Sequence, residues 1–259
     1  MTIEELYRHL CDFAPAALSA PWDNDGIACC TDKTRPVRRV LVALDATAQM
    51  VKRAIDGGFD LLLTHHPLLF KGVKELTPDH TVPRKLLQLA AAGVTAMSFH
   101  TRLDAAKGGV NDILAEMLEL KDVKPFGPVG EEMGRIGTLK NTMTAKECAK
   151  TVCETLHIPA VLLAGDKEVT TVAVLGGEGG DFVNAAIEAG ADLFLAGRIG
   201  YHRMLDGAEE GIALIEAGHF ATEVAVCHKL SELVKTADPT IEVEVCDTPT
   251  ICMIEGEKK

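Results

Sequence analysis

The sequence predicts an α/β protein of two similar lobes, each with a mostly parallel sheet flanked by helices. Residues 40–64 and 172–196 share one pattern: an apolar run, a helical stretch, Gly-x-Asp and a second apolar run. That order is typical of a β-α-β unit. The apolar runs are continuous rather than alternating, which indicates strands of a parallel sheet covered on both faces. Two such units far apart in the chain indicate two lobes rather than a solenoid.

The first ten residues, MTIEELYRHL, predict an amphipathic helix. Thr2 is the expected N-cap, and Glu5 lies three positions on, where it completes a capping box. This start lacks the basic residues and uninterrupted apolar run of a secretory signal. No stretch approaches the ~18 to 20 apolar residues that a membrane span needs. We therefore expect a cytoplasmic protein whose eight cysteines are reduced thiols.

The first lobe is predicted to span residues 1–126. Its repeated unit is followed by a longer excursion that contains prolines, residues 67–83, and then by a helix and a strand within residues 85–100.

A cluster of Pro and Gly without apolar periodicity, residues 124–134, marks the expected boundary between the lobes. The second lobe is predicted to span residues 127–259. After its repeated unit, residues 206–219 again predict a helix and a strand. A last strand-like run, residues 241–254, could join either sheet.

Composition excludes several classes of function. Hydrophobic residues make up 47% and charged residues 25% of the chain, which is typical of a globular protein with its own core. The formal net charge of -12 argues against a broad nucleic-acid-binding surface, because such a surface needs clustered Lys and Arg. A local basic pocket for a small anion stays compatible with this charge.

Potential metal ligands follow three of the predicted strands. His65 and His66 end the first unit, Asp104 follows the next strand, and His219 and Glu223 lie four residues apart at the start of a helix. Open α/β sheets bind ligands at the carboxyl ends of their strands. Taken singly, each signal has an ordinary explanation: a surface turn, a helix cap, or a solvated helix pair.

If the lobes face each other, the three signals converge on one site. A mixed set of imidazoles and carboxylates suits Zn, Mn, Fe, Co or Ni better than Ca or Mg. Five ligands are too many for one tetrahedral ion and suit two ions that share a carboxylate. We expect Glu223 to bridge, His65 and Asp104 to bind one ion, and His66 and His219 the other. The predicted chemistry is hydrolysis by a metal-bridging hydroxide.

Five motifs are spread along the whole chain: WDNDG at 22–26, THHP at 64–67, HTRLDAAKGGVND at 100–112, YHRMLDGAEEG at 201–211 and GHFATE at 218–223. In this combination and order they resemble one family, the GTP cyclohydrolase I type II homologs or NIF-three-like dinuclear metal proteins. The resemblance implies a two-lobed α/β fold, a ring-shaped homohexamer with its dinuclear centre facing the interior, and the same five ligands. The family name suggests a nucleotide substrate such as GTP.

The resemblance also points to residues around the ligands. His100 and His202 match family positions near the site, where they would support the ligands or contact substrate. Arg102 stands where the family often has Asn, and Arg198 where an acidic residue is common. Both arginines would favour an anionic substrate, or would act only as local salt-bridge partners.

Two alternatives remain open on sequence grounds. The glycines of residues 176–180 could cradle an anion with their backbone N–H groups or simply form a tight turn. The chain as a whole is either a metal-dependent hydrolase of a small substrate, with Glu223 essential to turnover, or a metal-stabilised hexameric scaffold or regulatory interaction protein without turnover. Open coordination positions beside a ligand-sized cavity would favour the enzyme.

Overall fold

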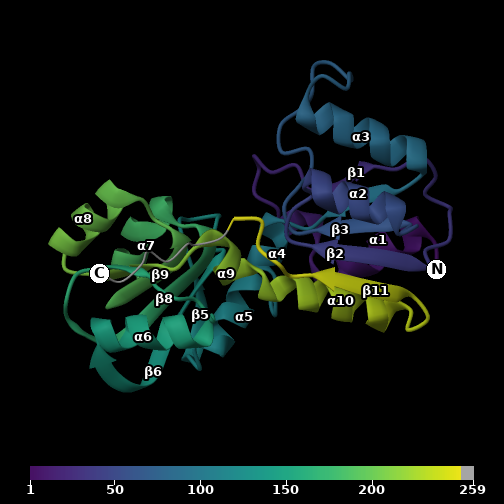
Figure 1. Cartoon of the computed structure of the whole chain (residues 1–259). Coiled ribbons are helices and arrows are strands. Elements are labelled where there is room, and N and C mark those ends of the chain that lie inside the picture. The colour runs from purple at the N-terminus through teal and green to yellow at the C-terminus, as the bar shows by residue number, and fades with distance from the viewer. Residues whose placement is uncertain (252–259) are drawn as a thin grey trace.

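The computed structural model describes residues 1–251, which form two α/β lobes side by side (Figure 1). The predicted capping box is confirmed, because Thr2 is the N-cap of helix α1 (Ile3–Phe13). The Thr2 hydroxyl accepts from the backbone N–H of Glu5, and the Glu5 carboxylate accepts from the backbone N–H of Thr2. No helix within these described residues is long and apolar enough to cross a membrane.

The first lobe holds a five-stranded sheet in which four neighbouring strands run parallel. The fifth strand, β1, is antiparallel to β4 at one edge. In spatial order the strands are β1 (Gly26–Cys29), β4 (Thr95–Ser98), β3 (Leu61–Thr64), β2 (Arg39–Ala43) and β11 (Glu242–Cys246).

Both faces of this sheet are buried, as the continuous apolar runs predict. On one face, Val40, Val42 and Leu61 pack against α1 and α10 (Ala225–Ala237). On the other, Leu41 and Leu62 pack against α2 (Ala48–Asp56) and α3 (Thr81–Ala92). Alternate residues of one strand therefore belong to two separate core clusters.

The second lobe holds a six-stranded mixed sheet. Strands β8, β9 and β10 run parallel to one another. Strand β6 pairs in antiparallel fashion with β8 and with β5, and β7 does so with β10. Helices α5 (Val110–Met117) and α6 (Ala145–Thr155) cover one face, and α7 (Val183–Glu188) and α8 (Tyr201–Glu209) cover the other. In spatial order the strands are β5 (Lys121–Phe126), β6 (Gly134–Thr144), β8 (Glu168–Glu178), β9 (Leu193–Arg198), β10 (Ala213–Glu216) and β7 (Leu162–Ala164).

The internal repeat is present in three dimensions. The order β2-α2-β3-α3-β4 of the first lobe corresponds to β8-α7-β9-α8-β10 of the second. The two aligned aspartates have the same role: the Asp60 carboxylate accepts from the backbone N–H groups of Arg38 and Arg39, and that of Asp192 from those of Thr170 and Thr171. Each carboxylate thus fixes the start of the neighbouring parallel strand.

The predicted lobe boundary between residues 126 and 127 differs from the sheet division. Strand β5 pairs with β6, so the second sheet begins at Lys121. The chain also returns: α10 packs in the core of the first lobe, and β11 pairs in parallel with β2. The first lobe is therefore built from two separated stretches of chain. Residues 252–254 of the predicted last strand lie outside the described residues.

Candidate metal centre

The predicted ligands meet between the lobes, where the short helices α4 (Thr101–Ala105) and α9 (His219–Glu223) lie (Figure 1). His65 and His66 directly follow β3, and their backbone N–H groups donate to the carbonyls of Ala43 and Leu44. These bonds extend the pairing with β2 past the end of β3 and hold both imidazoles at the sheet edge.

All five predicted ligands are brought together. The His65 Nε2 atom lies 3.5 Å from Asp104 Oδ1 and 3.8 Å from Glu223 Oε1. Glu223 Oε2 lies 3.1 Å from His66 Nε2 and 3.0 Å from His219 Nε2. Their ligand atoms form two groups, His65 with Asp104 and Glu223, and His66 with His219 and Glu223, each with atoms within 4.8 Å of one another. Glu223 is common to both groups.

Hydrogen bonds behind the ligands set the orientation of the imidazoles. His65 Nδ1 lies 2.8 Å from the carbonyl oxygen of Phe99, and His66 Nδ1 lies 2.8 Å from Asp45 Oδ1. A neutral imidazole that donates from Nδ1 has a free lone pair on Nε2. In both residues Nε2 is the atom that faces the carboxylates, so the donor set fits a metal ion.

Three atoms of the cluster are buried without a hydrogen-bond partner among residues 1–251. They are His65 Nε2, Asp104 Oδ1 and Glu223 Oε2. The residues are 0%, 7% and 4% exposed, respectively. Burying such groups unsatisfied is costly, and native proteins rarely do so. Divalent cations held by the two ligand groups would satisfy all three atoms.

The titration behaviour of the cluster fits the same interpretation. Burial lowers the pKa of His66, but the Asp45 and Glu223 carboxylates outweigh it and raise that pKa to about 10. Burial raises the pKa of Glu223, yet the three surrounding histidines hold it well below its usual range. Burial also raises the pKa of Asp104. Protons thus compensate the carboxylates, and a bound cation would replace them.

The two lobes supply equivalent pairs of side chains. His100 follows β4 and Asp104 lies four residues on, just as His219 follows β10 and Glu223 lies four residues on. His100 Nδ1 lies 2.9 Å from Asp23 Oδ1. Its ring centroid is 5.3 Å from that of His65 and 5.5 Å from that of His66. His100 therefore adjoins the cluster, and His65, His66 and His100 form a third group of potential ligands.

Three of the residues that the resemblance suggested lie outside the ligand groups of the described chain. Arg102 is 2% exposed, and its Nε and Nη2 atoms donate to Asp25 at 2.7 and 2.6 Å, so it is a buried salt-bridge partner and is not available to a substrate. His202 is exposed on α8 beside Tyr201 and belongs to none of the ligand groups in the described chain. Arg198 Nε lies 3.9 Å from Glu178 Oε2 at the surface. This contact fits the alternative that Arg198 acts as a local salt-bridge partner.

Two supporting carboxylates were missed. Asp45 follows β2, and Asp23 is buried where it accepts from the Thr101 backbone N–H and from His100. The position of Asp45, just beyond a predicted strand, is the signal that could have found it. Asp23 had no such signal apart from the resemblance, because it lies in a loop distant in sequence from Thr101.

The glycines at the end of β8 make room for the cluster. Gly177 has a φ of +71°, and a Cβ atom there would lie 2.2 Å from Glu223 Oε1. A Cβ on Gly176 would lie 3.1 Å from Glu223 Cγ. Close approach of a ligand side chain, rather than an anion cradle, accounts for these two glycines.

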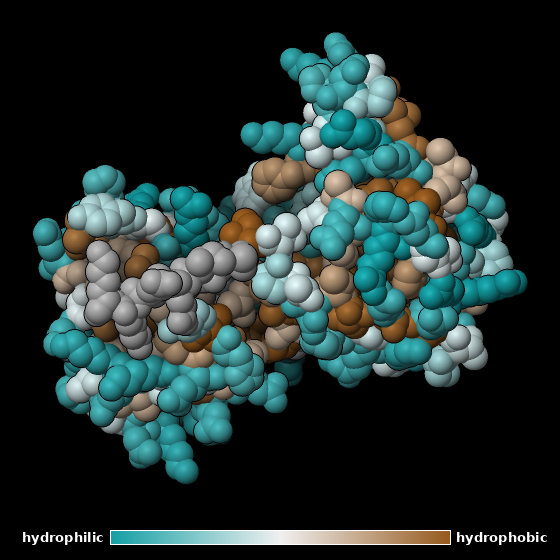
Figure 2. Space-filling view, viewed as in Figure 1, coloured by the Kyte–Doolittle hydropathy of each residue, from teal (hydrophilic) through white to brown (hydrophobic). Residues whose placement is uncertain are grey.

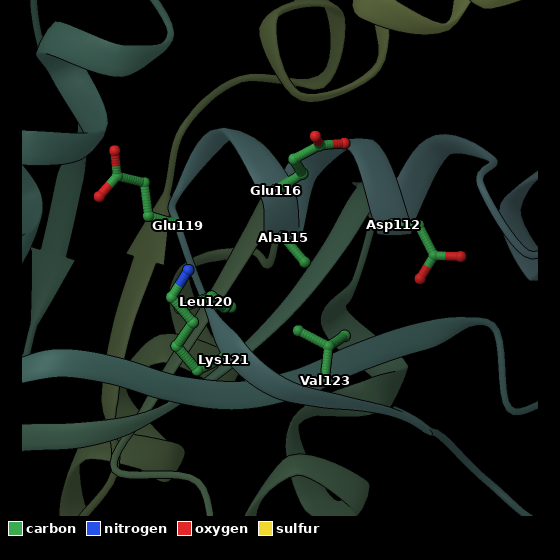
Figure 3. Close-up of a pocket in the computed structure, with 7 residues that line it drawn as sticks. All are labelled: Asp112, Ala115, Glu116, Glu119, Leu120, Lys121 and Val123. Atoms are coloured by element: carbon green, nitrogen blue, oxygen red, sulfur yellow. The ribbon is translucent and has the colours of Figure 1, made fainter.

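A surface cavity of about 390 Å³ lies away from this cluster, between α5 and β5 (Figure 3). Its walls include the carboxylates of Glu116 and Glu119 and the amine of Lys121. Asp112 also lines it, but its Oδ1 atom is bound by Arg135 Nε at 2.5 Å. None of the predicted ligands lines this cavity, so it has no part in the candidate centre.

Fold and site together define a class: two-lobed α/β proteins with a cluster of histidines and carboxylates, of the kind that binds metal, between the lobes. Residues 1–251 match the family described as Duf34/NIF3 (NGG1p interacting factor 3), and the chain belongs to this family.

Relatives with the same name come from distant organisms. The GTP cyclohydrolase 1 type 2 homolog of Clostridium perfringens is 34% identical over 241 residues, which cover 91% of this chain and 92% of that protein. The protein of the same name from Methanocaldococcus jannaschii is 30% identical over 240 residues, with 91% and 96% covered.

Solved structures share the fold over nearly the whole chain. A Bacillus cereus protein related to NIF3 has a TM-score of 0.87 at 22% identity, with 99% of each chain covered. Reduced HcgD from Methanocaldococcus jannaschii has a TM-score of 0.84 at 29% identity, with 96% of this chain and 98% of that chain covered.

Proposed function

We propose that the chain is a metal-dependent hydrolase that binds two divalent ions and acts on a small substrate. The observation that carries this proposal is the pair of ligand groups that share Glu223. His65 and Asp104 would hold one ion, His66 and His219 the other, and Glu223 both. The mixed N/O donors favour Zn, Mn, Fe, Co or Ni over Mg or Ca.

Bound divalent ions would supply a hydrolytic nucleophile at neutral pH, because they lower the pKa of coordinated water. The protein's part is to hold its ligands in one geometry. Phe99 and Asp45 fix the rings of His65 and His66 from behind. Burial keeps the Asp104 and Glu223 carboxylates away from water, so that they retain their full attraction for a cation.

The cluster is buried on one side and accessible on the other. The side chains of His65 and Glu223 are 0% and 4% exposed, whereas those of His66 and His219 are 21% and 44% exposed. A substrate would therefore approach from the His66 and His219 side. The name of the Clostridium perfringens relative makes GTP one of the compounds to test.

Metal content tests the ligand assignment. We expect the reconstituted protein to bind two zinc ions per chain by elemental analysis, and Glu223→Gln to bind at most one, because both groups lose a charged ligand. Glu210→Gln, at an exposed position, is the matched control and should bind two. Full metal content in Glu223→Gln would contradict the assignment.

Turnover tests the hydrolase. The metal-loaded protein is assayed against nucleotides, phosphoesters and cyclic amides, beside Glu223→Gln and Glu210→Gln. Hydrolysis that is lost only in Glu223→Gln supports the enzyme. No hydrolysis of any compound, with an assembly mass that falls on chelation, would instead support a metal-stabilised scaffold.

The ring-shaped homohexamer implied by the resemblance stays a prediction. Mass photometry of the metal-loaded protein tests it, with six chains per particle as the expected result. A monomer under the same conditions would contradict it.

A further inference from the structure

Two large aromatic side chains are exposed next to each other. Trp22 is 53% exposed and Phe70 is 47% exposed. Their ring centroids lie 6.0 Å apart at an interplanar angle of 61°, an edge-to-face arrangement. Trp22 lies in the loop before β1, and Phe70 in the loop that follows His66. Adjacent exposed apolar rings are uncommon on a protein surface without a binding role.

The pair adjoins the candidate metal centre. The ring centroids of Trp22 and Phe70 are each 6.2 Å from that of His100. His100 in turn contacts His65 and His66. A small molecule that rests on Trp22 or Phe70 is therefore separated from the ligand imidazoles by the width of one ring.

Hydrogen bonds hold both loops in place. The Asp23 carboxylate, next to Trp22, is 0% exposed and accepts from the Thr101 backbone N–H at 3.1 Å and from His100 Nδ1 at 2.9 Å. The Asn24 side-chain amide donates to the carbonyl of Leu69, the residue before Phe70. Because folding already fixes the pair, a ligand that binds there does not bear the entropy cost of ordering the loops.

We infer that Trp22 and Phe70 form a stacking platform for a planar heteroaromatic ring. The ring belongs to a small-molecule ligand whose polar end reaches the cluster of proposed metal ligands. Only the place that the polar end reaches rests on the proposed function. Stacking of a base on an aromatic side chain is tolerant of the base, because every base has a π face. The platform therefore selects for a class of ring rather than for one compound.

The geometry favours a planar ring over a cation. An aromatic cage for a quaternary ammonium group needs space between its walls, but these three rings contact one another edge to face and leave none.

The single tryptophan of the chain makes the test specific. The indole N–H resonance of Trp22 in the metal-loaded full chain is followed by NMR during titration with GMP, AMP and UMP. Ribose 5-phosphate, which carries the same phosphate without a ring, is the control compound. We expect the nucleotides to shift the resonance and ribose 5-phosphate to leave it in place.

Variants separate stacking from other contacts. We expect Phe70→Leu, which keeps apolar bulk but removes the π face, to weaken nucleotide binding about 5- to 100-fold. Tyr201→Ala is the matched control, since Tyr201 is 73% exposed on α8 in the second lobe and should leave binding unchanged. Circular dichroism verifies that both variants fold.

Three outcomes would overturn the inference. The indole resonance stays unmoved by all three nucleotides, ribose 5-phosphate shifts it equally, or Phe70→Leu changes the assembly mass while nucleotide affinity is unchanged. The last outcome would make the pair a subunit contact. The titration detects binding without turnover, so a protein that binds nucleotides and hydrolyses nothing contradicts the proposed hydrolase but leaves the platform standing.

Discussion

At the scale of single residues, Gly177 shows how closely the backbone approaches one of the proposed metal ligands. Gly177→Ala would introduce a Cβ atom 2.2 Å from Glu223 Oε1 at a φ of +71°. We expect the variant to lose about 1 to 2 kcal/mol of stability from the left-handed backbone alone. We also expect it to bind zinc at least tenfold more weakly, because Glu223 must move.

Gly190→Ala is the matched control for this prediction. Gly190 has a φ of +81°, but a Cβ atom added there would have no neighbour within 4 Å. The variant should lose similar stability and keep its zinc affinity, as measured by thermal unfolding and competition with a chelator. Equal zinc affinity in the two variants would show that Gly177 is not required for the position of Glu223.

The raised pKa of His66 predicts two opposite trends with rising pH. The stability of the metal-free protein should fall, and the affinity for zinc should rise. The folded-state pKa is about 10 and the ordinary value is 6.5, so the protonated imidazole stabilises the metal-free protein fully below pH 6.5. This contribution is lost as the pH rises towards 10. Zinc competes with the same proton, so zinc affinity should increase with pH over that window.

Thermal unfolding with excess chelator, at several pH values between 6.5 and 10, measures the first trend. Zinc titration at the same pH values measures the second. His66→Asn removes the titrating ring. Both unfolding stability and zinc affinity should then vary less with pH than in the wild-type protein. A zinc affinity that is independent of pH in the wild-type protein would show that zinc does not compete with a proton on His66.

That the five proposed ligands lie together was predictable, because their signal is local. His65, His66, Asp104, His219 and Glu223 each follow an apolar run, and the ends of parallel strands share one edge of a sheet. The environment of Arg102 was not predictable in this way. Its partner Asp25 lies in a loop far away in sequence, so only the folded chain reveals that the guanidinium is buried and neutralised.

At the scale of elements, α10 shows that the end of the chain stabilises the first lobe. Leu230 is 1% exposed within the core shared by α1, α10 and the first sheet. We expect Leu230→Ala to cost about 2 to 5 kcal/mol, the range for a leucine truncated in a packed core. Chemical denaturation measures it.

Glu232→Ala on the same helix is the control. Glu232 is exposed and pairs with Lys229 at the surface, so its removal should change stability by less than about 1 kcal/mol. Hydrogen exchange locates the effect: Leu230→Ala should weaken protection of β2 and β3 before that of β8 and β9. Loss confined to the second sheet would contradict the placement of α10.

The elements themselves were largely predictable, and their pairing only in part. Both β-α-β units follow from continuous apolar runs, which are specific to buried parallel strands. Strand β5 was missed because Lys121 to Pro125 are all exposed and carry no apolar period. The place of β11 depends on pairing with β2, across nearly the whole length of the chain, which no local pattern encodes.

At the scale of the whole molecule, helix α5 lies between the lobes and contacts both of the short helices that carry proposed ligands, α4 and α9. In Figure 2 the lobes are separated by a notch in the upper outline of the molecule. The buried Asn111 side chain of α5 donates to the carbonyls of Asp104 and Met133 and accepts from the Gly176 backbone N–H at 2.7 Å. The Asn111 side chain therefore links the backbone of Asp104 to β8, the strand that lies against Glu223.

We expect Asn111→Ala to weaken zinc binding about tenfold or more although its side chain contacts no ligand atom, since the two lobes lose their register. It should also lose about 1 to 3 kcal/mol of stability for the unsatisfied buried groups. Asn141→Ala, at an exposed position of β6, is the control and should change neither quantity. Unchanged zinc affinity in Asn111→Ala would show that the lobes are aligned by other contacts.

In the proposed centre, both lobes together bind a pair of ions through one shared carboxylate. A crystal structure of the zinc-loaded protein, with an anomalous difference map at the zinc edge, would locate these ions. We expect two peaks per chain, one beside His65 and Asp104, the other beside His66 and His219, with Glu223 in contact with both. One peak, no peak, or a Glu223 side chain that contacts one ion or neither would rule out the shared carboxylate.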